Sequence, residues 1–119
     1  MDDSLARLQA LAIAFRDERD WKQFHRPKDL ALGLTAEAGE LAELFLWKTD
    51  AELEALREDS PERQRLGEEL ADILIYILYL ADTSGLDLAA ACRSKLVANA
   101  AKYPVEKARG SARKYTELE

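Results

Sequence analysis

Two stretches of this sequence place acidic residues where a helix needs apolar side chains. The first stretch contains Leu30, Leu34, Glu37, Leu41 and Leu44, which are alternately four and three residues apart. This spacing is the period of one helix face. In the second stretch, positions with the same period are Leu66, Glu69, Ile73, Tyr76 and Leu80. This period predicts two amphipathic helices, each with a carboxylate on its core-facing stripe.

Each of these acids has an acidic partner three residues later, on the same side of its helix. Glu40 follows Glu37, and Asp72 follows Glu69. An ionised carboxylate on a buried stripe is costly unless it is paired or binds a cation. If the two helices pack antiparallel, the four carboxylates converge, and ligation by oxygen alone selects Mg²⁺, with Mn²⁺ as a substitute. The alternative is that the acids face solvent or pair with Arg and Lys across the bundle.

The composition is typical of an all-α protein. The 119 residues include three prolines and five glycines, and Leu, Ala, Glu, Lys and Arg dominate. We predict one domain over residues 1–119. Cys92 is the only cysteine and His25 the only histidine, which excludes a disulfide framework and a Cys/His zinc site. The acidic N-terminus and the lack of an apolar run near the ~18 residues of a membrane span predict a cytoplasmic protein without a membrane partner.

Caps, prolines and periodicity predict four long helices. Their expected bounds are about Asp3 to Asp20, Pro27 to Trp47, Pro61 to Thr83, and Asp87 to just before Pro104. A short helix from Ala51 to Arg57, capped by Asp50, is expected between the second and third. The third helix has Ser60 as its cap and ends near Gly85 in a left-handed cap.

Apolar positions on the first and third helices predict what these helices bury. The first helix, with Asp2, Asp3 or Ser4 as its cap, has an expected buried stripe of Leu5, Leu8, Leu11, Ala12 and Phe15. The centre of the third helix, Ile73 to Ala81, is apolar on every side. A helix of that kind is buried on all faces, which in a chain this small indicates a subunit interface and therefore an oligomer.

The charge is divided unevenly along the chain. The net charge of −6 argues against DNA or RNA binding. Residues 93–114 nevertheless carry seven cationic side chains and one acidic side chain, so the rest of the chain carries −12. Lys95, Asn99 and Lys102 share one helix face in this segment, and the basic tail of residues 104–119 has no clear periodicity. The segment either contacts an anionic ligand or is a solvated helix end and tail.

A metal held by carboxylates predicts a phosphorylated substrate, because Mg²⁺ usually completes its shell with substrate phosphates. Trp21, Trp47 and Tyr76 offer flat faces for a nucleotide base, although Trp21 and Trp47 are equally interpreted as core residues. His25, beside Phe24 in an aromatic connection, is interpreted as a surface or capping residue rather than a catalytic one.

Five segments of the chain carry a resemblance to a known family. They are Arg19–His25, Glu37–Phe45, Glu68–Tyr76, Lys102–Pro104 and Ser111–Leu118. In these segments the chain resembles the MazG-like nucleoside triphosphate pyrophosphohydrolases of the all-α superfamily, and most closely their dCTP pyrophosphatase branch.

The resemblance implies a four-helix bundle core that assembles as a homotetramer. It also implies Mg²⁺-dependent cleavage between the α- and β-phosphates of a nucleoside triphosphate, which gives the monophosphate and pyrophosphate. By this resemblance Glu37, Glu40, Glu69 and Asp72 bind the metal, and Glu37 and Glu40 are the catalytic residues. Substrate contacts are assigned to Trp21, Trp47, Tyr76, Lys95, Asn99 and Lys102.

The expected substrate is dCTP or a related or modified pyrimidine nucleotide. In animal members of the family a histidine of the first helix helps to read the pyrimidine, and the matching position here is Ala12. The alternatives are another specificity, such as dUTP, a non-catalytic helical module that binds nucleotide in the same cleft, and an interaction protein with no ligand.

Overall fold

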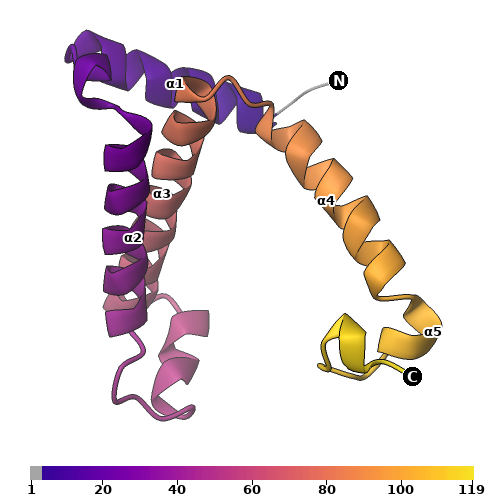
Figure 1. Ribbon diagram of the computed structural model, residues 1–119. Helices are drawn as coiled ribbons and strands as arrows, with labels where there is room; N and C mark the ends of the chain where they lie inside the picture. The colour runs from indigo at the N-terminus through magenta and orange to yellow at the C-terminus, as the bar shows by residue number, and fades with distance from the viewer. Residues whose placement is uncertain (1–3) are drawn as a thin grey trace. The chain divides into compact units, whose positions relative to one another are not determined.

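The computed structural model describes residues 4–119, in which every regular element is a helix (Figure 1). The α-helices of this part are α1 (Ser4–Glu18), α2 (Pro27–Glu43), α3 (Pro61–Thr83), α4 (Leu88–Lys102) and α5 (Val105–Ala108). The 3₁₀ helices are η1 (Lys22–Phe24), η2 (Glu52–Arg57) and η3 (Tyr115–Glu117). The all-α class predicted from composition is therefore confirmed.

The described residues form two compact units, 4–86 and 87–119, and each is described by itself. Three of the four predicted long helices, α1, α2 and α3, belong to the first unit, and α4 opens the second. Within residues 4–119 no single helix is both long and apolar enough to cross a membrane. Only α3 and α4 counted together, across the break between them, reach that length and apolarity.

Helices α2 and α3 run antiparallel, side by side, and form the centre of the first unit (Figure 1). Leu30 of α2 and Leu78 of α3 are each only 2% exposed, and Tyr79 and Ala81 of α3 are also buried. The residues of the two predicted stripes are all at least partly buried, including the acidic ones. The stripes therefore face the helix–helix contact, as their period predicts.

The start and end of α3 agree with the prediction. Ser60 caps the helix, because its Oγ accepts a hydrogen bond from the backbone N–H of Arg63 at 3.2 Å. At the other end Gly85 adopts a left-handed conformation with φ of 67°. The N–H of Leu86 then donates to the carbonyl of Ala81 at 2.9 Å, which satisfies one of the last carbonyls of the helix.

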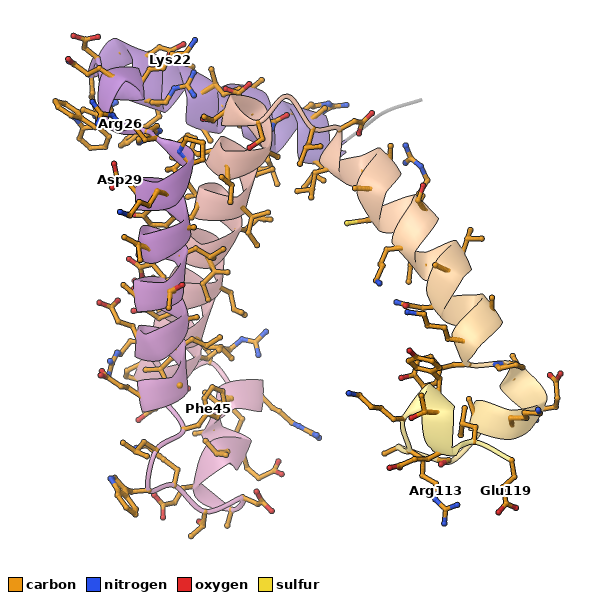
Figure 2. All side chains as sticks on the ribbon, viewed as in Figure 1. Lys22, Arg26, Asp29, Phe45, Arg113 and Glu119 are labelled. Atoms are coloured by element: carbon orange, nitrogen blue, oxygen red, sulfur yellow. The ribbon has the colours of Figure 1, made fainter. Side chains whose placement is uncertain are left out.

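Helix α2 ends at Glu43, so the predicted end at Trp47 is wrong. After Glu43 the chain tightens into turns, in which the N–H of Phe45 (labelled in Figure 2) donates to the carbonyl of Ala42 at 3.0 Å. Trp47 then takes a left-handed conformation with φ of 63°, and it is 92% exposed. The helix stops early because the chain has to reverse direction before α3, and a left-handed residue makes that reversal.

The expected short helix is present as a 3₁₀ helix, η2, but its expected cap is wrong. The capping hydrogen bond is made by Thr49 and not by Asp50. The Oγ1 atom of Thr49 accepts from the N–H of Glu52 at 3.2 Å. Thr49 lies three residues before that N–H, the spacing at which a short side chain reaches the first turn.

Helix α1 ends at Glu18, two residues before the predicted end, and Asp20 follows with φ of 53°. The candidate caps Asp2 and Asp3 lie outside the described residues, and Ser4 is the first residue of the described helix. The predicted buried stripe is also wrong in the single chain, because Leu8, Leu11 and Phe15 are exposed.

Polar contacts explain why the apolar stripe of α1 is not buried. Arg16, only 2% exposed, donates from Nη1 to Oδ2 of Asp82 at 3.0 Å. The hydroxyl of Tyr79 donates to the carbonyl of Ala12 at 2.8 Å, and Gln9 Nε2 donates to the carbonyl of Leu78 at 3.0 Å. These contacts hold α1 against α3 through a polar face, which leaves the apolar stripe to line an open cavity.

A close contact between α2 and α3 gives a testable prediction. A Cβ added at Gly33 lies 2.5 Å from Cε1 and 2.7 Å from Cζ of Tyr76, whereas one added at Gly39 meets nothing within 4 Å. We expect Gly33→Ala to lose about 1–3 kcal/mol of stability through overpacking. Gly39→Ala on the same helix should gain about 0.5–1 kcal/mol, because it removes only the entropic penalty of glycine. Urea denaturation of both variants measures the difference, and equal gains at the two sites would contradict the contact.

In the second unit the tail folds back on its own helix. Asp87 caps α4 by accepting the N–H of Ala90 at 3.0 Å, and α4 ends at Lys102, as predicted. The ring of Tyr115 meets Tyr103 edge to face, with centroids 6.0 Å apart, and lies 5.0 Å from Nζ of Lys102. The tail, which lacked periodicity in the sequence, thus contains α5 and η3.

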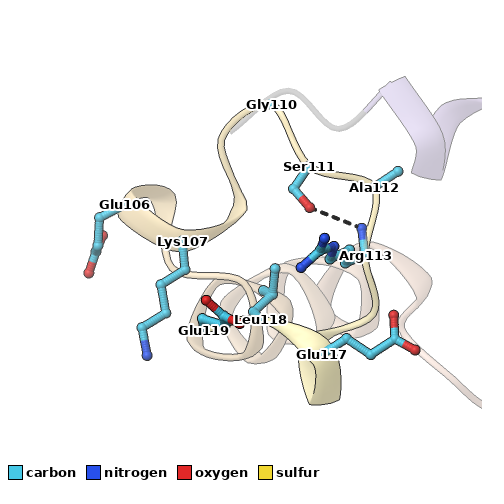
Figure 3. Close-up of a pocket in the computed structure, with 9 residues that line it drawn as sticks. All are labelled: Glu106, Lys107, Gly110, Ser111, Ala112, Arg113, Glu117, Leu118 and Glu119. Carbon is cyan, nitrogen blue, oxygen red and sulfur yellow. Dashed lines mark hydrogen bonds between the residues drawn. The ribbon is translucent and has the colours of Figure 1, made fainter.

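The folded tail also forms a wide, open pocket of about 820 Å³, whose lining residues are drawn in Figure 3. Two basic side chains line it, those of Lys107 and Arg113, and so do three acidic ones, those of Glu106, Glu117 and Glu119. The N–H of Arg113 donates to Oγ of Ser111 at 3.2 Å, which fixes the turn between them. Because charges of both signs line it, the cavity does not favour an anion.

Candidate active site

Three carboxylates converge at the contact between α2 and α3. Glu37 and Glu40 come from successive turns of α2, and Glu69 comes from α3. One oxygen from each lies within 4.8 Å of one oxygen of each of the others. Glu37 and Glu69 are half-buried, and Glu40 is exposed. The packing of two acidic stripes therefore brings together three of the four predicted ligands; we call these three residues the acid cluster.

Two oxygens of the acid cluster are buried without a partner. Oε2 of Glu37 and Oε2 of Glu69 are enclosed and accept no hydrogen bond from any group in residues 4–119. A buried carboxylate oxygen without a partner is costly, so each such oxygen needs an explanation. A divalent cation fits these donors, because Mg²⁺ and Mn²⁺ bind carboxylate oxygens. Pairing with Arg or Lys, the alternative, does not satisfy these two atoms.

The cluster changes the acidity of its central residue. Burial, together with the neighbouring Glu69, Glu40 and Asp72 carboxyls, raises the pKa of Glu37 from 4.5 to about 7. Near pH 7, and without a bound cation, the Glu37 carboxyl is therefore protonated in part of the molecules. Like charges crowded around a half-buried acid favour either a proton or a cation.

This pKa predicts how stability depends on pH in metal-free buffer. Between pH 4.5, where Glu37 ionises when unfolded, and about 7, the folded state binds more protons at this group than the unfolded state does. The contribution of Glu37 to the free energy of unfolding therefore falls as the pH rises through this window, and it is level above it. Urea denaturation of wild type and Glu37→Gln in a chelator, at a series of pH values, isolates this contribution. A wild-type minus variant difference that stays flat or rises with pH contradicts it.

Asp72, the fourth predicted ligand, lies beside the acid cluster but outside it. Its charge contributes to the raised pKa of Glu37, so it is close enough to interact electrostatically. Asp72 is exposed and also lines an apolar cavity of the first unit. It therefore marks the place where the cavity approaches the acid cluster, and its role as a ligand stays a prediction.

The cavity beside Asp72 has the size and lining of a small-molecule site. Its volume is about 680 Å³, within the range of roughly 300–1,000 Å³ that ligand pockets occupy. Residues of α1, α3 and the connection after α1 line it, among them Phe15, Trp21 and Tyr76. The rings of Phe15 and Trp21 meet edge to face with centroids 5.7 Å apart. Two of the three predicted base-contacting aromatics, Trp21 and Tyr76, are thus brought to one cavity.

The other predicted substrate contacts lie elsewhere in the chain. Trp47 is in the turns after α2 and does not line this cavity. Lys95, Asn99 and Lys102 lie on α4 in the second unit, so their contact with a ligand stays a prediction.

Sequence reasoning missed His25 and Tyr79 as cavity residues. The available signal for His25 was the run of aromatic residues between the first two helices. Tyr79 gave no signal, because it was one more apolar residue of the third helix.

Comparison with known proteins agrees with this geometry. A sequence model of the MazG-like family matches residues 34–118, which is most of the chain. The chain belongs to the MazG-like family. This MazG-like chain is 48% identical over 117 residues to dCTP pyrophosphatase 1 of Rattus norvegicus and equally to that of Homo sapiens. Each alignment covers 98% of this chain and 69% of the relative.

A solved structure shares the fold. The crystal structure of a pyrophosphatase from Archaeoglobus fulgidus superposes on this MazG-like chain with a TM-score of 0.77 and 35% sequence identity. The match covers 87% of this chain and 95% of the archaeal one. The all-α architecture is therefore that of a MazG-like pyrophosphatase.

Proposed function

We propose that this protein hydrolyses a deoxynucleoside triphosphate to the monophosphate and pyrophosphate, with dCTP or a related or modified pyrimidine nucleotide as its favoured substrate. The proposal rests on the acid cluster, which has two buried oxygens without a hydrogen-bond partner, and on the aromatic cavity that approaches it at Asp72. A nucleoside triphosphate needs both parts, because its phosphates require cations and its base requires an apolar site. The names of the rat and human relatives support the same reaction and the same base.

Glu37, Glu40 and Glu69, together with Asp72, would hold Mg²⁺, with Mn²⁺ as a substitute. The donors are all carboxylate oxygens, and two of them have no other partner. When bound, such an ion neutralises phosphate charge and lowers the pKa of a coordinated water.

The side chains of the first unit divide the work of binding and proton transfer. The rings of Trp21 and Tyr76 pack against the base and exclude water from it. A carboxylate oxygen of Glu37 or Glu40 accepts the proton of the water that attacks the phosphoanhydride, and pyrophosphate or the monophosphate leaves. Glu40 is exposed, so solvent reaches its carboxylate directly.

Other parts of the chain complete the proposed site. Lys95, Asn99 and Lys102 would contact phosphate oxygens that no metal reaches, and Trp47, whose ring is exposed, would contact a nucleotide held at the metal. The protein would also assemble into an oligomer, and a homotetramer is the form that the family resemblance implies. The exposed apolar side chains of α1, such as Leu8 and Leu11, support burial against another subunit. A nucleotide substrate fits a cytoplasmic protein that removes unwanted nucleotides from the pool.

The test is hydrolysis of each common deoxynucleoside triphosphate by purified protein in Mg²⁺, with products separated by chromatography. We expect monophosphate and pyrophosphate in equal amounts, with the fastest reaction for dCTP. A faster reaction with dUTP would change the proposed base specificity but would leave the proposed reaction unchanged. Release of single phosphates, or nucleotide binding without turnover, would overturn the proposal, and the second result would indicate a non-catalytic module.

A further inference from the structure

Tyr76 belongs both to the contact between α2 and α3 and to the apolar cavity of the first unit. On α3 it lies one turn after Asp72 and two turns after Glu69, so its side chain continues the acidic face of the helix. Tyr76 lines the cavity together with Asp72, and it is half-buried. The position of its ring therefore helps to set how much space beside the acid cluster is open to a ligand.

The end of the Tyr76 side chain lies against α2 at Gly33. Gly33 is one turn before Glu37, on the same helix face. An ideal Cβ placed on Gly33 would lie 2.5 Å from Cε1, 2.7 Å from Cζ and 3.0 Å from the hydroxyl oxygen of Tyr76. Carbon atoms in ordinary contact are about 3.5–4.0 Å apart. The ring can come this close to the α2 backbone because Gly33 has no side chain.

A side chain at this position would displace the ring rather than the helices. The three atoms nearest to the added Cβ all belong to the end of the Tyr76 side chain, and no backbone atom is among them. To reach ordinary contact with a methyl group, the ring has to withdraw from α2 by about 1 Å. The open space next to Tyr76 is the cavity of about 680 Å³, so the ring would move into it. Gly33 therefore shapes the cavity although it does not line it.

We propose that Gly33 is a positioning residue, which lets the Tyr76 ring lie back against α2 and so keeps the cavity beside the acid cluster wide enough for a nucleotide base. This inference rests on the proposed function, since it places a base in that cavity. In this role Gly33 touches neither the metal nor the phosphates and acts only through the Tyr76 ring. Gly39 and Gly67 differ in this respect, because a Cβ added to either meets nothing within 4 Å.

The test measures the effect of Gly33→Ala on the binding of the base and of the phosphates separately. KM and kcat for dCTP are measured in Mg²⁺, together with inhibition by inorganic tripolyphosphate, which has phosphates but no base. We expect KM to rise about fivefold, within the range for the loss of an aromatic contact, with kcat and tripolyphosphate inhibition within about twofold of wild type. Gly67→Ala, on α3, is the matched control and should leave all three quantities unchanged.

Two further backgrounds show whether the Tyr76 ring carries the effect. Phenylalanine keeps Cε1 and Cζ, the two atoms closest to the added Cβ, so Gly33→Ala should raise KM by the same factor in Tyr76→Phe. Leucine has no ring, so Gly33→Ala should change KM by less than about twofold in Tyr76→Leu. The Tyr76→Phe background also removes the hydroxyl contact, and it replaces the single variant if Gly33→Ala alone does not fold.

Three results would overturn the role of Gly33. One is an unchanged KM in Gly33→Ala, and another is an equal rise in KM in the Tyr76→Leu background. The third is a rise in KM matched by an equal weakening of tripolyphosphate inhibition, which indicates a general distortion of the site.

Binding of dCMP, followed by tryptophan fluorescence, reads the fit of the base without turnover. If wild type binds dCMP but hydrolyses nothing, the proposed function fails, and the effect of Gly33→Ala on the dissociation constant of dCMP still decides the inference. If wild type neither binds dCMP nor hydrolyses a nucleotide, both the proposed function and the role of Gly33 fail.

Discussion

Replacing Glu37 by glutamine will lower kcat/KM for pyrophosphate release by roughly a hundredfold or more, the scale of a loss of several kcal/mol of electrostatic stabilisation. Glutamine keeps the length and shape of the side chain but removes one of the three carboxylates of the acid cluster. It also removes the group whose Oε2 is buried without a partner. Steady-state kinetics with dCTP in saturating Mg²⁺ measure the effect.

The same change should have the opposite effect on stability in a chelator. Wild type then carries a half-buried Glu37, and burial together with the nearby Glu69, Glu40 and Asp72 raises its pKa to about 7. Glutamine removes that unfavourable charge, so the melting temperature of Glu37→Gln should equal or exceed that of wild type. Adding Mg²⁺ should raise the melting temperature of wild type by mass action and raise that of the variant less.

Glu68→Gln is the matched control for both effects. Glu68 is adjacent to Glu69 on α3, but it is exposed, and its Oε1 accepts only a weak hydrogen bond of 3.4 Å from Gln64. This variant should keep wild-type activity and wild-type stabilisation by Mg²⁺. Two results would rule out the acid cluster as the centre of catalysis. One is a kcat/KM of Glu37→Gln within threefold of wild type. The other is a loss of activity accompanied by a melting temperature in chelator well below that of wild type.

The acid cluster was predictable from sequence because a helical period reports which side chains share a face. Glu37 and Glu69 each replace an apolar residue on a regular stripe, and stripes on neighbouring helices have to meet. The ends of α3 were predictable for a similarly local reason, since Ser60, Pro61 and Gly85 act through the backbone next to them.

The features that were missed depend on contacts between distant residues. Periodicity marks the apolar face of α1 but not what covers it, and Arg16 joins α1 to α3 through Asp82, 66 residues away. The early end of α2 depends on the chain reversal before α3, which leaves Trp47 in a left-handed turn. The isolated position of His25 in the sequence likewise gave no indication that its ring would pack on Tyr79.

The ion pair of Arg16 should be the largest single polar contribution to the stability of the first unit. Arg16 is 2% exposed, and its partner Asp82 is 33% exposed. We expect Asp82→Asn to lower the free energy of unfolding by about 3 kcal/mol, because it leaves a buried guanidinium with only the more exposed Asp17 for charge compensation. Urea denaturation in chelator measures the loss.

Arg16→Met should cost less than Asp82→Asn, although it breaks the same pair. Methionine fills the buried site with apolar atoms, and the carboxylates of Asp82 and Asp17 turn to water. In the Arg16→Met background, Asp82→Asn should then have almost no effect, so a double-mutant cycle should show strong coupling. The pair of Arg57 and Glu54, which is exposed on both sides, is the control, and Glu54→Gln should change stability by less than about 0.5 kcal/mol. Equal losses from Asp82→Asn with and without Arg16 would mean that the guanidinium is not what Asp82 stabilises, and α1 would then be held to α3 by its other contacts.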